Sequence, residues 1–246
     1  VFGRDGIDGR GMPMASTVRL GLRNKRPFFN ALWDGFGMVY GDPTDRASIV
    51  TGQESKNDIF ETFTLLDIYG HEIGHAITDQ DGGTEYYGQS GALNEHYSDV
   101  MGESFKMWAN KISADGHDWV VGKGIFKDGV NGRNGIRNML LPGTAYNDFW
   151  LGKDPQPDHM DGYVKMRLDN GGVHHNCGIP NRARRYAGVE PSFAKFAFHT
   201  LAACRKFGNR HDLAKLKKAW KDVGVTPSAT AVDTDTPPSV TMPAHN

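Results

Sequence analysis

The feature that most constrains this chain is the pentapeptide His71-Glu72-Ile73-Gly74-His75. Residues four apart on an α-helix lie one turn apart on the same face, so the imidazoles of His71 and His75 can reach one metal ion. The carboxylate of Glu72 points to a neighbouring face, where it can take a proton from a water at that ion. Composition alone rarely gives this spacing. The pattern therefore favours a zinc peptidase over a surface helix that happens to carry two histidines.

A catalytic zinc ion needs a third protein ligand and leaves its fourth position to water. The best candidate for that ligand is Glu95, in the segment G-A-L-N-E-H-Y-S-D at 91–99. Asp99 lies four residues further along the same predicted helix, where it can accept the ring N–H of a ligand histidine. His96 is a rival ligand, but it projects about 100° away from Glu95 and is predicted to lie at the surface or behind the ligands. Without the zinc motif, this segment would be interpreted as a solvated acidic face.

Length and charge allow a globular enzyme and argue against several other classes. The chain has 246 residues, enough for one large domain or two lobes with a hydrophobic core. Its net charge of −1 predicts no nucleic-acid partner and no anionic membrane surface. No apolar run approaches the roughly 18 residues of a membrane-spanning helix, and the first residues are not a signal peptide, although one could have been removed. Cys177 and Cys204 form no C-x-x-C motif, which leaves one disulfide or two buried thiols open.

Turn residues and hydrophobic spacing divide the chain into two lobes and a tail. Before residue 57, turn signals alternate with short strand-like runs at 16–22 and 37–40, which predict a β-rich lobe. Asp58 with Glu61 resembles a capping box, so a long helix is predicted to begin there and to carry the zinc motif in its last turns. Further helices are predicted over 91–110, 191–207 and 212–223, the last capped by Asp212. The predicted organisation is a β-rich lobe with the zinc helix at 1–79, a mainly helical lobe at 80–225 and a flexible tail at 226–246.

Several separated segments, in the right order, resemble the thermolysin family of neutral metalloendopeptidases. The zinc motif followed by Glu95 looks like the gluzincin pattern, and G-A-L-N-E-x-x-S-D is similar to the family segment at that place. Further similar stretches lie at 7–13, 30–35, 38–42 and 169–174. P-G-T-A-Y at 142–146 and L-G-K-D-P-Q-P at 151–157 most resemble the branch that contains protealysin. The resemblance runs from about residue 4 to about residue 183 and resumes weakly in the last helix.

This resemblance implies both the fold and the metal site. The expected fold is an α+β zincin with a truncated β-rich N-terminal lobe, a central zinc-binding helix and a mainly α-helical C-terminal lobe. His71, His75 and Glu95 would hold one catalytic Zn²⁺, with Asp99 behind a ligand histidine. Glu72 would act as the general base and then deliver the proton to the leaving amine.

The resemblance also implies roles for residues outside the zinc helix. Tyr86 and His174 would stabilise the oxyanion of the tetrahedral intermediate, and Asp169 would orient His174. The expected substrate-binding residues are Arg137, for the carbonyl just past the scissile bond, Asn30 and Ala31, for the substrate backbone, and Ile68 and Ile136, for an apolar residue after the scissile bond.

Three departures from the family pattern qualify these expectations. Lys106 stands where the family commonly has a glutamate that contributes with Asp67 to a calcium site, so a calcium site is doubtful. The chain begins well inside the family's N-terminal lobe, and we expect its own upstream segment, a propeptide or a partner chain to cover the exposed strand edge. After Arg182 the helical lobe is shorter than in relatives.

The predicted function is a zinc-dependent endopeptidase that acts on peptide or protein substrates, and the predicted location is extracellular. One rival is a zinc aminopeptidase with the same ligands, which would need a further acidic residue for the substrate amine. The other rival is a catalytically weak zinc-binding remnant that acts as a binding or inhibitory protein. Peptide cleavage with and without a chelator distinguishes these functions.

Overall fold

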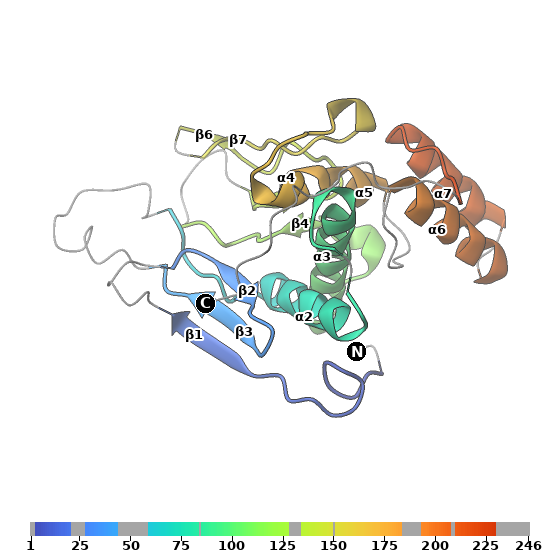
Figure 1. Cartoon of the computed structure of the whole chain (residues 1–246). Helices are drawn as coiled ribbons and strands as arrows, with labels where there is room; N and C mark the ends of the chain where they lie inside the picture. The colour runs from blue at the N-terminus through green and yellow to red at the C-terminus, as the bar shows by residue number, and fades with distance from the viewer. Residues whose placement is uncertain are drawn as a thin grey trace. The chain divides into compact units, whose positions relative to one another are not determined.

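The computed structural model describes residues 3–20, 28–43, 59–83, 85–127, 134–149, 151–183, 193–207 and 210–229 (Figure 1). The chain forms two compact units, each built from two separate stretches. Unit 1 comprises residues 1–83 and 96–155, and unit 2 comprises residues 84–95 and 156–246. Helix α3 (Gly88–Asn110) runs unbroken through the division, with its first turns in unit 2 and the remainder in unit 1. Most of the predicted tail lies outside the described residues.

The β-rich part of unit 1 is a three-stranded mixed sheet. Strands β1 (Ser16–Leu20), β2 (Ala31–Trp33) and β3 (Met38–Gly41) are arranged in the order β1-β3-β2. Strand β3 is parallel to β1 and antiparallel to β2. The carboxylate of Asp34 accepts hydrogen bonds from the N–H groups of Phe36 and Gly37 and closes the β2–β3 turn. The strands predicted at 16–22 and 37–40 are thus confirmed within the described residues, and β1 and β2 form the two edges of the sheet.

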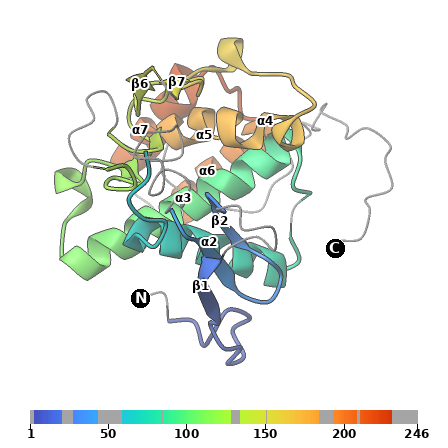
Figure 2. The ribbon, with the colours of Figure 1, turned by 90° about the vertical axis from the view of Figure 1, so that its left-hand side faces the viewer.

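Helix α2 (Leu66–Gln80) packs against β2 and β3 over the core of unit 1 (Figure 2). The prediction that this helix begins at Asp58 is wrong for the described part of that stretch. Phe60 instead forms an antiparallel bridge with Phe126, and the N–H of Glu61 donates to the carbonyl of Ile125 at 2.8 Å. This tertiary pairing keeps the chain extended despite its helical hydrophobic spacing. The zinc motif therefore lies in the middle of α2 and not in its last turns.

Helices α2 and α3 approach closely enough to require glycine in their interface. A Cβ atom added to Gly74 would lie 2.7 Å from the Cα of Ser98, and one added to Gly102 would lie 2.2 Å from the backbone oxygen of Asp67. Both distances are far inside van der Waals contact. The glycines thus let the two helix backbones meet directly, and this contact fixes α3 against the helix that carries the zinc motif.

Short strands complete unit 1. Strands β4 (Val120–Val121) and β5 (Arg137–Asn138) pair antiparallel, as do β6 (Asn147–Asp148) and β7 (Gly152–Lys153). A single 3₁₀ turn, η2 (Ala114–Gly116), precedes β4. The β4–β5 pairing holds Arg137 beside the hydrophobic core of unit 1.

Unit 2 is helical and encloses its own core. Its helices after α3 are α4 (Asp169–Asn176), α5 (Gly178–Ala183), α6 (Phe193–Phe207) and α7 (Arg210–Asp222), with the 3₁₀ turn η3 (Met160–Gly162) before them. Trp220 is buried in this core and donates its indole N–H to Thr200 at 3.0 Å. Because α7 begins at Arg210, Asp212 lies inside its first turn, and the predicted cap at Asp212 is wrong.

Cys177 and Cys204 are both buried and are not joined in a disulfide, which resolves the alternative that the sequence left open. Among the described residues, we find no helix with the length and apolar character needed to cross a bilayer.

Candidate metal centre and active site

Three side chains from α2 and α3 converge on one point. The ligand atoms of His71, His75 and Glu95 all lie within 4.8 Å of one another. His71 and His75 are one turn apart on α2, and their Nε2 atoms are 2.9 Å apart. Glu95 is fully buried on α3. Within the described residues this is the one group of three or more His, Cys, Asp or Glu side chains arranged to hold a metal ion.

Asp99 holds His71 in the orientation that a metal ligand needs. A carboxylate oxygen of Asp99 lies 2.9 Å from Nδ1 of His71, so the ring N–H is directed to Asp99 and the Nε2 lone pair points to the convergence point. Arg137 donates to the same carboxylate from Nε at 2.9 Å and from Nη2 at 2.5 Å. Burial alone would raise the pKa of Asp99, but the Arg137 charge and the His71 hydrogen bond hold it well below its usual range.

The donor set fits zinc. Two imidazole nitrogens and one carboxylate are the ligands of many catalytic zinc sites, which leave one position for water. The Nε2 atoms of His71 and His75 are 2.9 Å apart, so both nitrogens could act as ligands of one zinc ion. The carboxylate of Asp99 behind His71 supplies the outer hydrogen bond that such ligands usually have.

Glu72 lies between the two ligand histidines in the sequence but on another face of α2. It is buried, with 5 % of its surface exposed. Burial raises the pKa of the nearby Tyr40 hydroxyl far above its usual range, and the charge of Glu72 raises it further. Glu72 is thus a buried carboxylate next to the predicted metal ligands.

A second polar group forms in unit 2 around His174. The hydroxyl of Tyr86 donates a short hydrogen bond to Glu95, and Nε2 of His174 lies 3.4 Å from the same carboxylate oxygen. On the other side of the imidazole, Nδ1 of His174 lies 2.5 Å from Asp169. Burial alone would raise the pKa of Asp169, but the contacts with His174 and His175 hold it below its usual range. The structure therefore brings Tyr86, His174, Asp169 and Glu95 together in one unit.

The backbone at the start of α4 explains how Asp169 reaches His174. Asp169 and Asn170 have φ angles of 53° and 48°, and Gly171 and Gly172 continue the left-handed run at 82° and 80°. L-residues adopt this region at a cost, which the two glycines avoid. The run turns the chain so that the Asp169 carboxylate also accepts the backbone N–H of His174 at 3.0 Å.

The predicted substrate-binding residues lie at different depths. Asn30 is exposed beside β2, and Ala31 begins that edge strand. Ile136 is half-buried, whereas Ile68 is 4 % exposed within the core of unit 1. Arg137 is 8 % exposed and engaged with Asp99. The substrate roles of these residues stay predictions.

Tertiary contacts place several of these residues differently from the sequence-based predictions. His96 was predicted at the surface or behind the ligands, but it is 1 % exposed, so a surface position is excluded. The ion pair between Arg137 and Asp99 was not predicted, because the two residues are far apart in the sequence. The contact of His175 with Asp169, at 3.1 Å, also has no signal in the local sequence pattern.

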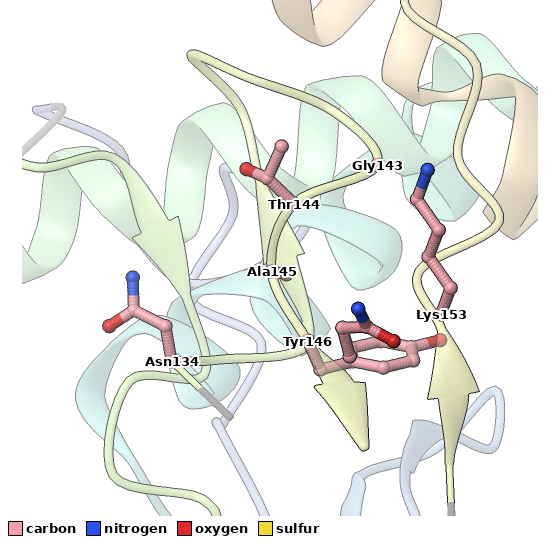
Figure 3. Close-up of a pocket in the computed structure, with 7 residues that line it drawn as sticks. Asn134, Gly143, Thr144, Ala145, Tyr146 and Lys153 are labelled. Atoms are coloured by element: carbon pink, nitrogen blue, oxygen red, sulfur yellow. The ribbon is translucent and has the colours of Figure 1, made fainter. Parts of the chain in front are cut away.

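A separate pocket in unit 1 contains none of the predicted site residues (Figure 3). It is lined by Asn134, Gly143, Thr144, Ala145, Tyr146, Asn147 and Lys153. Two hydrogen bonds hold the lining of this pocket. The N–H of Asn134 donates to the carbonyl of Ala145, and the side chain of Asn138, on β5, donates to Thr144.

The fold and the convergent His, His and Glu side chains define the class of a metallopeptidase. The family description "Thermolysin metallopeptidase, catalytic domain" matches residues 1–79, and "Thermolysin metallopeptidase, alpha-helical domain" matches residues 82–190. The chain therefore belongs to the thermolysin family of metallopeptidases, whose members are zinc endopeptidases. The predicted family and the α+β zincin fold are confirmed.

Individual relatives agree with this assignment. An extracellular metalloprotease of Pectobacterium carotovorum is 37 % identical over 92 % of this chain and 67 % of its own length. Protease PrtS of a Photorhabdus species is 40 % identical over 74 % of this chain, which spans about half, 46 %, of that protease. The structure of the protealysin precursor from Serratia proteamaculans superposes with a TM-score of 0.78 at 36 % identity, over 92 % of this chain and 73 % of that one.

Proposed function

We propose that this chain is a secreted zinc-dependent endopeptidase that hydrolyses internal peptide bonds. The observation that carries the proposal is the convergence of His71, His75 and Glu95, with Asp99 directing the His71 ring. Zinc bound there would lower the pKa of a water molecule and polarise the substrate carbonyl. Secretion is supported by the relatives that are named as extracellular metalloproteases.

In this proposal Glu72 transfers a proton from the attacking water to the leaving amine. Its carboxylate takes a proton from the attacking water, and the resulting carboxylic acid then gives that proton to the leaving amine. Burial supports this role, because a carboxylate with little access to solvent exchanges its proton with the reacting groups and not with bulk water.

Tyr86 and His174 stabilise the negative charge that develops on the carbonyl oxygen. A hydroxyl donor and an imidazolium are suitable groups for this task. Asp169 supports it because its carboxylate contacts Nδ1 and so orients the His174 ring. The hydrogen bond from Tyr86 to Glu95 keeps the phenol next to a predicted metal ligand.

Substrate would bind along β2 and beside β5. Asn30 and Ala31 lie at a sheet edge that can pair with an extended peptide, and Arg137 binds the carbonyl past the scissile bond. Ile68 and Ile136 form an apolar pocket for the residue after that bond, where a charged side chain would lose its hydration without gaining a partner. Cleavage-site profiling should show an apolar preference there, and a preference for Asp, Lys or Arg would contradict this pocket.

A propeptide or upstream segment is the proposed partner besides the substrate. Strand β1 is an edge strand with mostly exposed side chains, and the related protealysin structure is that of a precursor. A segment that covered this edge would reduce the hazard of an unpaired strand.

The test is turnover of an internally quenched peptide by zinc-loaded protein, by chelated protein and by the variant Glu72→Gln. Chelation should abolish cleavage, and added zinc should restore it. Glu72→Gln should keep zinc and fold but lose at least about 10²-fold in rate, the scale of general-base loss. Glu61→Gln, at an exposed glutamate of the same unit, is the matched control. Protein that binds stoichiometric zinc but cleaves no peptide would instead support a zinc-binding remnant.

A further inference from the structure

Helices α2 and α3 present two facing rows of ionisable residues. Asp67, His71 and His75 recur every fourth residue on α2, and Glu95, Asp99 and Glu103 recur every fourth residue on α3. His75, His71 and Glu95 form the metal group, and Asp99 meets His71. The last pair, Asp67 and Glu103, is 1 % and 0 % exposed and has no part in the mechanism above.

Two further residues, Lys106 and His117, contact Asp67 and Glu103 and form a cluster with them. Nζ of Lys106 lies 2.9 Å from Asp67 and 3.6 Å from Glu103, and it donates to the carbonyl of Val120 at 3.1 Å. Nε2 of His117 forms a short hydrogen bond with Glu103. Asp67 also accepts the backbone N–H of Gly122 at 2.8 Å. The cluster thus joins α2, α3 and the segment that forms β4.

The charges of this cluster do not balance without a bound proton. With His117 neutral, two buried carboxylates and one partly buried ammonium leave one negative charge, which is costly away from water. The groups that face Glu103 are Asp67 on α2, Asp99 and Lys106 on α3, and His117 before β4, while the more distant Asp118 acts on Lys106. Burial raises the pKa of Glu103, the charges of Asp67 and Asp99 act in the same direction and the charge of Lys106 opposes them, and together these effects place that pKa at about 9.

We propose that Glu103 is a neutral carboxylic acid that donates its proton to Nε2 of His117, and that this pair acts as a positioning device for the metal centre. Glu103 lies one helical turn from Asp99 on the same rigid helix. When hydroxide removes this proton at high pH, an unbalanced negative charge remains in the cluster. This charge weakens the packing of α3 against α2. Asp99 then loses its alignment with His71. The activity readout rests on the proposed function, whereas the unfolding readout does not.

The test compares wild-type protein with Glu103→Gln, which has the shape of the neutral acid but does not titrate. A group whose folded-state pKa is raised stabilises the fold fully below its unfolded pKa, and the contribution is lost as pH rises to the folded pKa. Between pH 5 and about 9 the unfolding constant of the zinc-loaded wild type should therefore rise relative to that of Glu103→Gln by up to about tenfold per pH unit. The alkaline limb of kcat/KM should move to higher pH in Glu103→Gln. Glu61→Gln should follow the wild type in both measurements.

The variant His117→Gln and an infrared spectrum provide two further tests of a proton on Glu103. His117→Gln retains an acceptor for Glu103 and should keep the wild-type dependence of unfolding on pH. Parallel unfolding curves for wild type and Glu103→Gln, or a pH dependence lost only in His117→Gln, would refute a proton on Glu103. If Glu103→Gln does not fold, the infrared band of a buried carboxylic acid in the wild type should disappear on titration near pH 9. Absence of that band would also overturn the proposal. If the unfolding result holds but no peptide is cleaved, the endopeptidase function fails and the buried proton stands.

Discussion

The metal cradle, defined as His71, His75, Glu95 and Asp99, differs in construction from the donor group, defined as Tyr86, His174 and Asp169. In the cradle, His71, Glu95 and Asp99 are at most 5 % exposed and all four residues lie on two long helices. In the donor group, Tyr86 is 36 % exposed, the His174 side chain is 48 % exposed, and the left-handed run at Asp169 holds the geometry.

This difference separates two kinds of requirement. A metal ligand must be preorganised before the ion arrives, and buried helical side chains with hydrogen-bonded partners meet that need. An oxyanion donor must meet a substrate, so it has to remain accessible. We therefore expect substitutions in the cradle to change metal content, and substitutions in the donor group to change rate while zinc stays bound.

The largest effect is expected for His75→Ala compared with His174→Ala. Removal of His75 leaves two protein ligands, so stoichiometric zinc and peptide cleavage should both be lost. His174→Ala should keep zinc and lose only rate. Metal analysis after gel filtration, with turnover of the quenched peptide, makes the comparison. Full zinc retention in His75→Ala would show that the cradle is assigned to the wrong residues.

A smaller effect is expected for Asp99→Ala. Without the carboxylate, His71 loses the partner that fixes its ring, and Arg137 is left buried without its main counter-charge. Zinc affinity should weaken about 10–100-fold, as for other groups that orient metal ligands. Competition with a chelator measures this change, and Asp99→Asn keeps the shape as a control. Unchanged affinity in Asp99→Ala would mean that α2 alone holds the His71 ring.

The sequence predicts the features of the metal cradle that depend on local helical spacing, but not those that depend on contacts between remote residues. Helical spacing is a local property, so His71 and His75, and likewise Glu95 and Asp99, could be paired from the sequence. The start of α2 could not, because Phe60 is held extended by Phe126, a contact remote in the sequence. The ion pair between Arg137 and Asp99 has the same cause, since the β4–β5 pairing brings Arg137 to α3. The roles of Tyr86 and His174 depended on family resemblance, because neither residue has an informative local spacing.

Asp169→Asn tests whether the donor group acts on rate alone. Loss of the carboxylate charge removes a charge-assisted hydrogen bond to His174, and kcat should fall about tenfold at neutral pH with zinc content unchanged. The lowered folded-state pKa of Asp169 means that its stabilising contribution is present above the unfolded pKa and is lost as pH falls through the folded pKa. The stability of wild type and Asp169→Asn should therefore converge in acid. A constant difference down to the lowest pH that the fold tolerates would contradict this linkage.

The smallest effect is expected for added calcium, and its reason lies beside the cradle. Calcium prefers several oxygen ligands at close range. The Asp67 carboxylate instead accepts hydrogen bonds from Lys106 and from the N–H of Gly122, at 2.9 and 2.8 Å. The Lys106 ammonium thus supplies the positive charge between α2, α3 and β4.

Millimolar calcium should therefore leave the thermal unfolding temperature of the zinc-loaded protein unchanged, since a ligand that does not bind the folded state cannot stabilise it. Lys106→Glu replaces the ammonium with a carboxylate next to Asp67 and Glu103. That variant should be less stable than the wild type without calcium and should regain stability when calcium is added. Lys215→Glu, at an exposed position on α7, changes the net charge equally and should show no such response. Two bound calcium ions in the wild type, with a strong rise of its unfolding temperature, would contradict the prediction that the Lys106 ammonium takes the place of calcium beside Asp67. In that case the environment of the cradle would depend on calcium.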